Sequence, residues 1–177
     1  GDGHWTNEKA ITITVGEKPF EKYLMSLFRD LFGKVSYYPD KRKVDVGRVS
    51  AHGKDIRQFL NNLGWVVDCT TTTKQIPHTI MQSPKSVVCA FLRGLFETDG
   101  SAYQQSITLS SASYELARET QLLLLNLGIT SNLSKSNRED RTEYRIRLKG
   151  SKSKRIFDQH IGFISERKKK CLEGVMS

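Results

Sequence analysis

The sequence predicts an α+β protein in which one structural plan occurs twice. Its 177 residues are 37% hydrophobic and 9% aromatic, a composition typical of a globular protein with a sizeable core. An Asp-Gly pair occurs at Asp2 and again at Asp99. After each pair come a strand-like run, an amphipathic helix, two further strand-like runs and a short helix. This shared order indicates an internal repeat.

The first copy opens with alternating residues at 10–15, a pattern that predicts a β-strand. Apolar side chains at helical spacing predict a helix over residues 19–32, which Pro19 begins and Gly33 ends. The remaining elements of this copy are expected at residues 34–38 (strand), 43–51 (strand) and 55–63 (helix).

An apolar helix over residues 87–99 precedes the second copy, with Asp99 in its last turn and Gly100 as its stop. An acid at the negative end of the helix dipole costs roughly 0.3–1 kcal/mol, so its position suggests a function. Ala90 and Gly94 leave one helix face nearly bare, and another backbone could approach it closely. The other elements are expected at residues 106–110 (strand), 113–127 (helix), 131–135 (strand), 137–141 (charged loop), 143–149 (strand) and 154–161 (helix).

These patterns divide the chain into an N-terminal repeat over residues 1–73, a linker over residues 74–86 and a C-terminal repeat over residues 87–177. No apolar run approaches the roughly 18–20 residues of a membrane span. The three cysteines form no Cys-x-x-Cys pair, which argues against a zinc site or a disulfide framework and fits an intracellular, reducing setting. The histidines lack metal-ligand spacing, and no phosphate-binding glycine loop occurs.

The positive charge of the chain is concentrated near its C-terminal end. The net charge is +9, and residues 135–170 hold 13 Lys/Arg against 5 Asp/Glu, which leaves 15 against 14 elsewhere. This asymmetry indicates a polyanionic partner, most simply nucleic acid, although a solvated basic surface is the alternative.

Period-2 alternation over residues 143–149 directs Tyr144, Ile146 and Leu148 toward a core and the basic residues between them to the opposite face. An all-basic sheet face suits phosphates and guanine edges in a major groove. The predicted DNA-binding residues are Lys43, Arg48, Arg138, Arg141, Arg145, Arg147 and Lys149.

If the two repeats pack across a pseudo-twofold axis, Asp2 and Asp99 meet at one end of the interface. Two carboxylates held close together need a counter-charge, and a divalent cation such as Mg²⁺ or Mn²⁺ supplies it. A metal held between two acids can support phosphodiester hydrolysis. The alternative is that each Asp-Gly is only a common turn dipeptide. Lysines follow both copies, at Lys74 and at residues 168–170, where they are either solvated or placed to polarise a phosphate.

Three segments together resemble one protein family. The run Phe91-Leu92-Arg93-Gly94-Leu95-Phe96-Glu97-Thr98-Asp99-Gly100 resembles the LAGLIDADG motif of homing endonucleases. Lys74-Gln75-Ile76-Pro77 resembles the Lys-x-Ile-Pro element of intein endonucleases, and residues 161–168 resemble their closing segment.

The resemblance implies a duplicated αββαββα-type fold in which antiparallel sheets form a saddle over double-stranded DNA. It also implies Mg²⁺-dependent double-strand cleavage of a long asymmetric site, leaving short 3′ overhangs. By the motif match, Asp2 and Asp99 are the metal-binding catalytic acids and Lys74 is one active-site lysine. Lys168 is the second, with Lys169 and Lys170 as alternatives.

Two departures from the family pattern bear on activity. The first motif survives only as Gly1-Asp2-Gly3, so the helix expected before it is either missing from this sequence or supplied by another chain, or the piece is inactive. The residues for protein splicing are also missing, which indicates an endonuclease domain taken out of its host protein. We expect a monomer with internal pseudo-symmetry unless another chain supplies the helix.

A non-cleaving nucleic-acid-binding module of the same fold, such as an RNA maturase or a degenerate endonuclease, is the alternative function. It would keep the basic sheet and lack metal-dependent cutting. A structural protein that uses the bare helix face for dimerisation is a third class, and the concentration of positive charge argues against it.

Overall fold

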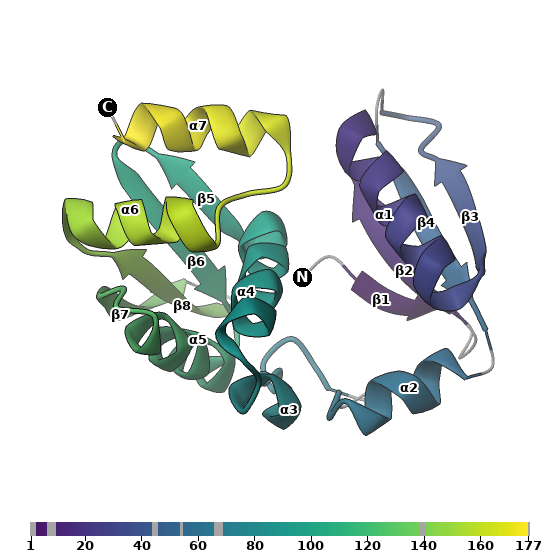
Figure 1. Cartoon of the computed structure of the whole chain (residues 1–177), viewed down its shortest axis with the longest axis horizontal. Helices are drawn as coiled ribbons and strands as arrows, with labels where there is room; N and C mark the ends of the chain where they lie inside the picture. The colour runs from purple at the N-terminus through teal and green to yellow at the C-terminus, as the bar shows by residue number, and fades with distance from the viewer. Residues whose placement is uncertain are drawn as a thin grey trace. The chain divides into compact units, whose positions relative to one another are not determined.

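A computed structural model of the chain (Figure 1) describes residues 3–6, 10–43, 46–53, 55–65, 69–138 and 141–176. The chain divides into two compact units, Gly1–Asn62 and Leu63–Ser177, and each has its own four-stranded antiparallel sheet and hydrophobic core. The predicted α+β class and the repeated plan are therefore confirmed. The division at residues 73 and 86 stays a prediction.

The N-terminal unit is a sheet with strand order β1-β2-β4-β3, and α1 lies across one face of it (Figure 1). Its elements are β1 (Gly3–Thr6), β2 (Ala10–Val15), α1 (Lys18–Phe32), β3 (Lys34–Pro39), β4 (Gly47–His52) and α2 (Ile56–Asn62). All strand pairs are antiparallel.

Helix α1 forms where the apolar spacing predicts it. Proline in the first turn has a backbone already suited to a helix, and a glycine with φ of 77° ends it at Gly33. Leu24 and Phe28, one turn apart, pack against Val49 and Ala51 of β4. Because side chains alternate along a strand, Arg48, which directly precedes Val49, lies on the opposite face of the sheet.

The C-terminal unit repeats this plan with additional helices, and its strand order, β5-β6-β8-β7, is the same. Helices α4, α5 and α7 all contact the sheet. The elements are α3 (His78–Met81), α4 (Lys85–Asp99), β5 (Gly100–Tyr103), β6 (Ser106–Ser111), α5 (Tyr114–Asn126), β7 (Ser131–Arg138), β8 (Arg141–Leu148), α6 (Gly150–His160) and α7 (Glu166–Met176).

An aromatic cluster at the centre of this unit joins three segments that are far apart in sequence. Phe96 of α4 and Phe157 of α6 are fully buried, with ring centroids 4.9 Å apart. Phe163, from the loop between α6 and α7, lies 5.5 Å from Phe157. The cluster fixes the end of α4 against the start of α7.

Several expectations about element boundaries are wrong. The residues expected as a loop at 137–141 belong largely to strands, because β7 continues to Arg138 and β8 begins at Arg141. Lys149 was expected in a strand and instead lies after β8, at the N-terminal cap position of α6. Strands β1 and β5 have no counterpart among the predicted elements.

Three observations limit the chemistry of the described part of the chain. Cys69, Cys89 and Cys171 are free thiols. None of its helices has both the length and the apolar character needed to cross a membrane. No group of three or more His, Cys, Asp or Glu side chains within it forms a metal site.

Candidate functional site

Asp99 is the last residue of α4 and is partly exposed. The helix is anchored by Leu92 and Phe96, which are fully buried. It ends because the chain turns directly into β5 at Gly100, whose N–H still donates to the Phe96 carbonyl. A Cβ atom on Gly100 would lie 2.6 Å from that carbonyl oxygen, so this position admits only glycine without a backbone shift.

The bare face of α4 is also as expected. Ala90 and Gly94 are exposed, and nothing lies within 4 Å of a Cβ built on Gly94. On another face of the helix, Arg93 donates from Nε to the Ile161 carbonyl and from Nη2 to the His160 carbonyl at 3.3 Å. It thereby caps the C-terminal end of α6.

Glu97, two residues before Asp99, is buried and binds the start of α7. Its Oε2 accepts hydrogen bonds from the backbone N–H groups of Ile164 at 2.7 Å and Ser165 at 3.2 Å. These are donors at the positive end of α7, where a carboxylate is favoured by the helix dipole. Glu97 is absent from the predicted site residues, although its place in the LAGLIDADG-like run is a signal for it.

Lys168 of α7 is buried and binds the end of α4. Its Nζ donates to the carbonyls of Phe96 at 3.2 Å, of Glu97, and of Gly100 at 2.7 Å. The ammonium also lies 5.5 Å from the centroid of the Phe163 ring. The structure therefore brings Lys168 to the helix end that carries Asp99. The alternatives, Lys169 and Lys170, are exposed, and Lys169 pairs with Glu166 at 2.8 Å.

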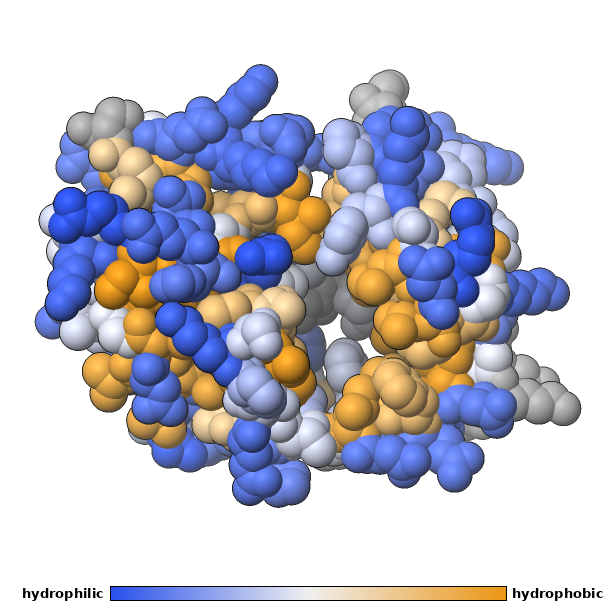
Figure 2. All heavy atoms as spheres, viewed as in Figure 1, coloured by the Kyte–Doolittle hydropathy of each residue, from blue (hydrophilic) through white to orange (hydrophobic). Residues whose placement is uncertain are grey.

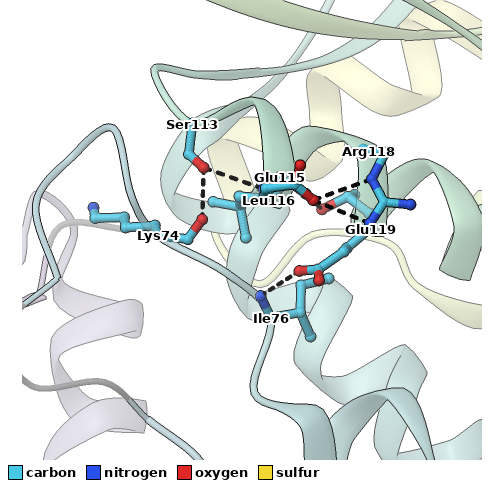
Figure 3. Close-up of polar contacts among 8 residues, drawn as sticks. Lys74, Ile76, Ser113, Glu115, Leu116, Arg118 and Glu119 are labelled. Atoms are coloured by element: carbon cyan, nitrogen blue, oxygen red, sulfur yellow. Dashed lines mark hydrogen bonds and ion pairs between the residues drawn. The ribbon is translucent and has the colours of Figure 1, made fainter.

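Lys74 lies in the segment that precedes α3. This segment binds the start of α5 (Figure 3). Ser113, fully buried at the N-terminal cap of α5, accepts from Leu116 N–H at 3.2 Å and donates to the Lys74 carbonyl at 2.6 Å. Two residues along, the N–H of Ile76 donates to Glu119 at 2.7 Å. The backbone of Lys74 is thereby fixed while its side chain points away from Ser113 (Figure 3).

The structure does not describe two of the predicted site side chains, those of Asp2 and Arg138. Asp2 lies wholly outside the described residues. The described residues therefore supply one carboxylate, Asp99, of the predicted acid pair. Carboxylate oxygens are ligands that divalent cations of the Mg²⁺ class accept, so Asp99 fits its share of such a site.

The exposed face of the C-terminal sheet is rich in hydroxyl groups as well as arginines. Arg147 is exposed and lies across from Asn132 of β7 and Thr108 of β6. The expectation of an all-basic face is wrong, because Glu143 shares it and pairs with Arg145 at 3.1 Å. Arg145 also donates to Ser110 at 3.3 Å.

Additional basic residues surround these strands. Arg141 is exposed at the start of β8, and Lys149 is exposed at the cap of α6. Figure 2 shows that hydrophilic side chains cover α6 and α7 on the visible face of this unit. Much of the charge in residues 135–170 therefore lies on the surface, while Lys168 does not.

In the N-terminal unit, Arg48 is exposed on β4 between Thr14 of β2 and Tyr38 of β3. A groove of about 740 Å³ opens there and is also lined by Lys41 and Arg42. Lys43, which is exposed, follows these two residues in the connection between β3 and β4.

Comparison with known sequences places this chain among segments of larger proteins. Residues 86–162 match the family of LAGLIDADG-like domains. The chain is 33% identical over 177 residues to part of the replication factor C small subunit of Methanocaldococcus jannaschii, covering 98% of the chain and 9% of that protein. It is 30% identical over 129 residues to part of the replicative DNA helicase DnaB of Synechocystis, covering 68% of the chain and 15% of the helicase.

A third match, 35% identical over 101 residues, lies in a probable translation initiation factor of Thermococcus kodakarensis, covering 56% of the chain and 8% of that factor. The chain thus spans less than a sixth of the length of each of these relatives.

Solved structures share the arrangement of elements. I-DmoI in complex with DNA and Ca matches with a TM-score of 0.69 at 13% identity, over 93% of this chain and 83% of that one. Full-length DUF199/WhiA from Thermotoga maritima matches with a TM-score of 0.62 at 16% identity, over 98% of this chain and 54% of that one. The chain therefore contains a LAGLIDADG-like domain and has the fold of the LAGLIDADG homing endonucleases.

Proposed function

We propose that the chain is a site-specific DNA endonuclease domain that hydrolyses both strands with a divalent metal and leaves short 3′ overhangs. The observation that carries this proposal is the partly exposed Asp99 at the end of α4, held between buried Glu97 and Lys168. I-DmoI, which has this fold, has been solved with its target DNA in the presence of Mg and with DNA and Mn, which supports both DNA and a divalent metal.

Asp99 and Asp2 would hold the metal, which supplies charge neutralisation for the attacked phosphate. The side chain of Lys74, whose backbone carbonyl accepts from Ser113, would donate to a phosphate oxygen. The exposed sheet faces would bind the duplex: arginines contact phosphates and guanines, and the hydroxyls near Arg147 and Arg48 contact base edges.

We also propose that this domain is of the intein type. The relatives carry unlike names: a replication factor C small subunit, a replicative DNA helicase and a probable translation initiation factor. A segment that similar sequences share inside otherwise unlike proteins is most simply an inserted element. Its three free cysteines suit a reducing, intracellular host.

Cleavage of DNA carrying candidate target sites tests the proposal. The chain is expected to cut with Mg²⁺ or Mn²⁺ and to stop cutting when EDTA removes the metal, while binding persists. Asp99→Asn should reduce the cleavage rate by at least about 100-fold, since the charge that holds the metal is lost. Binding of the target, measured by gel shift, should change little. Equal losses of binding and cleavage would contradict the metal role.

A second candidate function is a non-cleaving DNA- or RNA-binding module of the same fold. One observation favours it: the Nζ of Lys168 already has three backbone carbonyl acceptors, so this lysine is poorly suited to contact a phosphate. Binding of a target at nanomolar concentration with no nicking at any Mg²⁺ or Mn²⁺ concentration would establish this alternative.

A further inference from the structure

We propose that Glu97 and Lys168 form a clasp that positions Asp99, and that Lys168 acts through Asp99 and not on DNA. The clasp comprises these two side chains and the backbone groups that they bind at the end of α4 and the start of α7. This inference rests on the proposed function, because it assigns Lys168 a positioning role in that reaction.

The two halves of the clasp are reciprocal. The carboxylate of α4 binds two N–H groups at the start of α7, and the ammonium of α7 binds carbonyls in the last turn of α4 and at Gly100, just beyond it. Each charge meets the helix end of opposite dipole sign. The two residues are 7% and 8% exposed, so water screens these contacts little.

The start of α7 depends on Glu97 more than on its own cap residue. Ser165 occupies the cap position, since its carbonyl accepts from Lys169 N–H at 3.0 Å. Within the described part of the chain, the buried Ser165 hydroxyl has no hydrogen-bond partner. A cap serine ordinarily binds the helix N–H groups with that hydroxyl. Here Glu97, from another helix, instead binds the N–H groups of Ile164 and of the cap residue Ser165 itself.

The N–H groups of the Lys168 ammonium equal in number the backbone carbonyls that accept from it near Asp99. An ammonium has three N–H groups, and three carbonyls accept from it, those of Phe96, Glu97 and Gly100. These carbonyls come from residues on both sides of Asp99. Because Gly100 also packs tightly on Phe96, the backbone that carries Asp99 is held from several directions. The carboxylate of Asp99 is the group that benefits, because small displacements of a metal ligand weaken metal binding.

A direct chemical role for Lys168 and a positioning role make different predictions. In a direct role, only loss of the lysine matters, and the maximal cleavage rate falls at every metal concentration. In a positioning role, loss of Glu97 has the same effect as loss of Lys168. Both then weaken metal binding in the absence of cleavage.

The experiment compares the 177-residue chain with Lys168→Met, Glu97→Ala and Glu97→Gln, with Lys152→Met as the control. Lys152 is exposed on α6, so its change removes a lysine without touching the clasp. Three quantities are measured: the Tm without metal or DNA, Mn²⁺ affinity by electron paramagnetic resonance, and single-turnover cleavage against Mg²⁺ concentration. Affinity and cleavage are measured well below the Tm of each variant.

We expect Lys168→Met and Glu97→Ala each to lower the Tm by roughly 5–10 °C and to weaken Mn²⁺ binding by about tenfold or more. Glu97→Gln keeps an oxygen acceptor and should restore Mn²⁺ affinity to within about twofold of the parent. Lys152→Met should match the parent in Tm and in Mn²⁺ affinity. The Mg²⁺ concentration for half-maximal cleavage should rise for the two disruptive variants, with most of the maximal rate recovered at high Mg²⁺.

The inference is overturned if Lys168→Met keeps parental Mn²⁺ affinity while its maximal cleavage rate falls about 100-fold or more. It is also overturned if Glu97→Ala leaves Mn²⁺ affinity unchanged. If Lys168→Met does not fold, Lys168→Gln replaces it, because the amide retains two N–H donors. If the parent chain cuts no DNA, the proposed function fails, and the clasp is judged on Tm and Mn²⁺ affinity alone.

Discussion

At the scale of single residues, two glycines near the end of α4 have opposite environments. Gly100 faces its own helix backbone, with the Phe96 carbonyl oxygen 2.6 Å from a Cβ position. Gly94 faces open space within the helix. Close packing therefore requires glycine at position 100. Gly94 lowers the stability of the helix, and no contact within its unit requires a glycine there.

We therefore expect Gly100→Ala to lower the free energy of unfolding by about 2–3 kcal/mol, because backbone must move to admit the methyl group. Gly94→Ala, the matched change, is expected to raise it by roughly 0.5–1 kcal/mol by its higher helix propensity. Urea unfolding monitored by circular dichroism measures both. A destabilising Gly94→Ala would show that another backbone packs on that face of α4.

Ser113 is a second residue with two roles at once. Its hydroxyl accepts from Leu116 N–H at the cap of α5 and donates to the carbonyl of Lys74. Ser113→Ala is expected to cost about 1–3 kcal/mol of unfolding free energy, since the Leu116 N–H and the partly buried Lys74 carbonyl both lose their partner. Ser151→Ala, at an exposed position of α6, is the control and should change stability by less than about 0.5 kcal/mol. Equal effects of the two changes would contradict this role.

At the scale of secondary-structure elements, β8 presents arginines of unequal availability. Arg145 is paired with Glu143 and bound to Ser110, whereas Arg147 is exposed between Asn132 and Thr108. A guanidinium already opposite a carboxylate has less to gain from a phosphate. The strand therefore offers Arg147 as its main contact for DNA.

Arg147→Ala is expected to weaken target binding by about 1–3 kcal/mol and to reduce the dependence of log affinity on log salt by about one. Arg145→Ala should have a smaller effect, because its guanidinium already pairs with Glu143 and gains less from a phosphate. Fluorescence anisotropy over a salt series provides both quantities. Glu143→Gln is the informative companion and should strengthen binding; a weaker complex would refute the proposed pairing effect.

The elements also show what the sequence could predict. Apolar spacing located α1 and α5 to within a residue or two, because these helices bury one face on a sheet. Strand β5 escaped prediction because its hairpin turn uses Gln104 and Gln105, both with positive φ, where glycine or asparagine is usual. The burial of Lys168 had no sequence signal, since its partners are backbone carbonyls that every residue has.

At the scale of the whole chain, the repeat was readable because both units use one strand order, β1-β2-β4-β3 and β5-β6-β8-β7. The charge asymmetry was readable as well, but its distribution over the surface was not. Pairing removes Arg145 and Lys169 from the available set, and burial removes Lys168. Such losses depend on tertiary neighbours, which composition does not reveal.

Nucleic-acid binding by the whole chain should depend strongly on salt, since its net charge of +9 is concentrated in one stretch. Affinity for duplex DNA without a target site is expected to fall by at least about tenfold between 50 and 200 mM salt. A filter-binding titration at several salt concentrations checks this. Affinity that does not respond to salt would exclude a phosphate-binding surface of the proposed size.

The clasp at the end of α4 has a consequence for the descent of such domains. Selection for a stable fold acts on Glu97 and Lys168, whereas selection for cutting acts on Asp99. A descendant that no longer cuts DNA can lose Asp99 at once, but it needs the other two to keep α4 and α7 together. In related domains that no longer cut DNA, an acid at the position of Glu97 should therefore be retained more often than one at the position of Asp99.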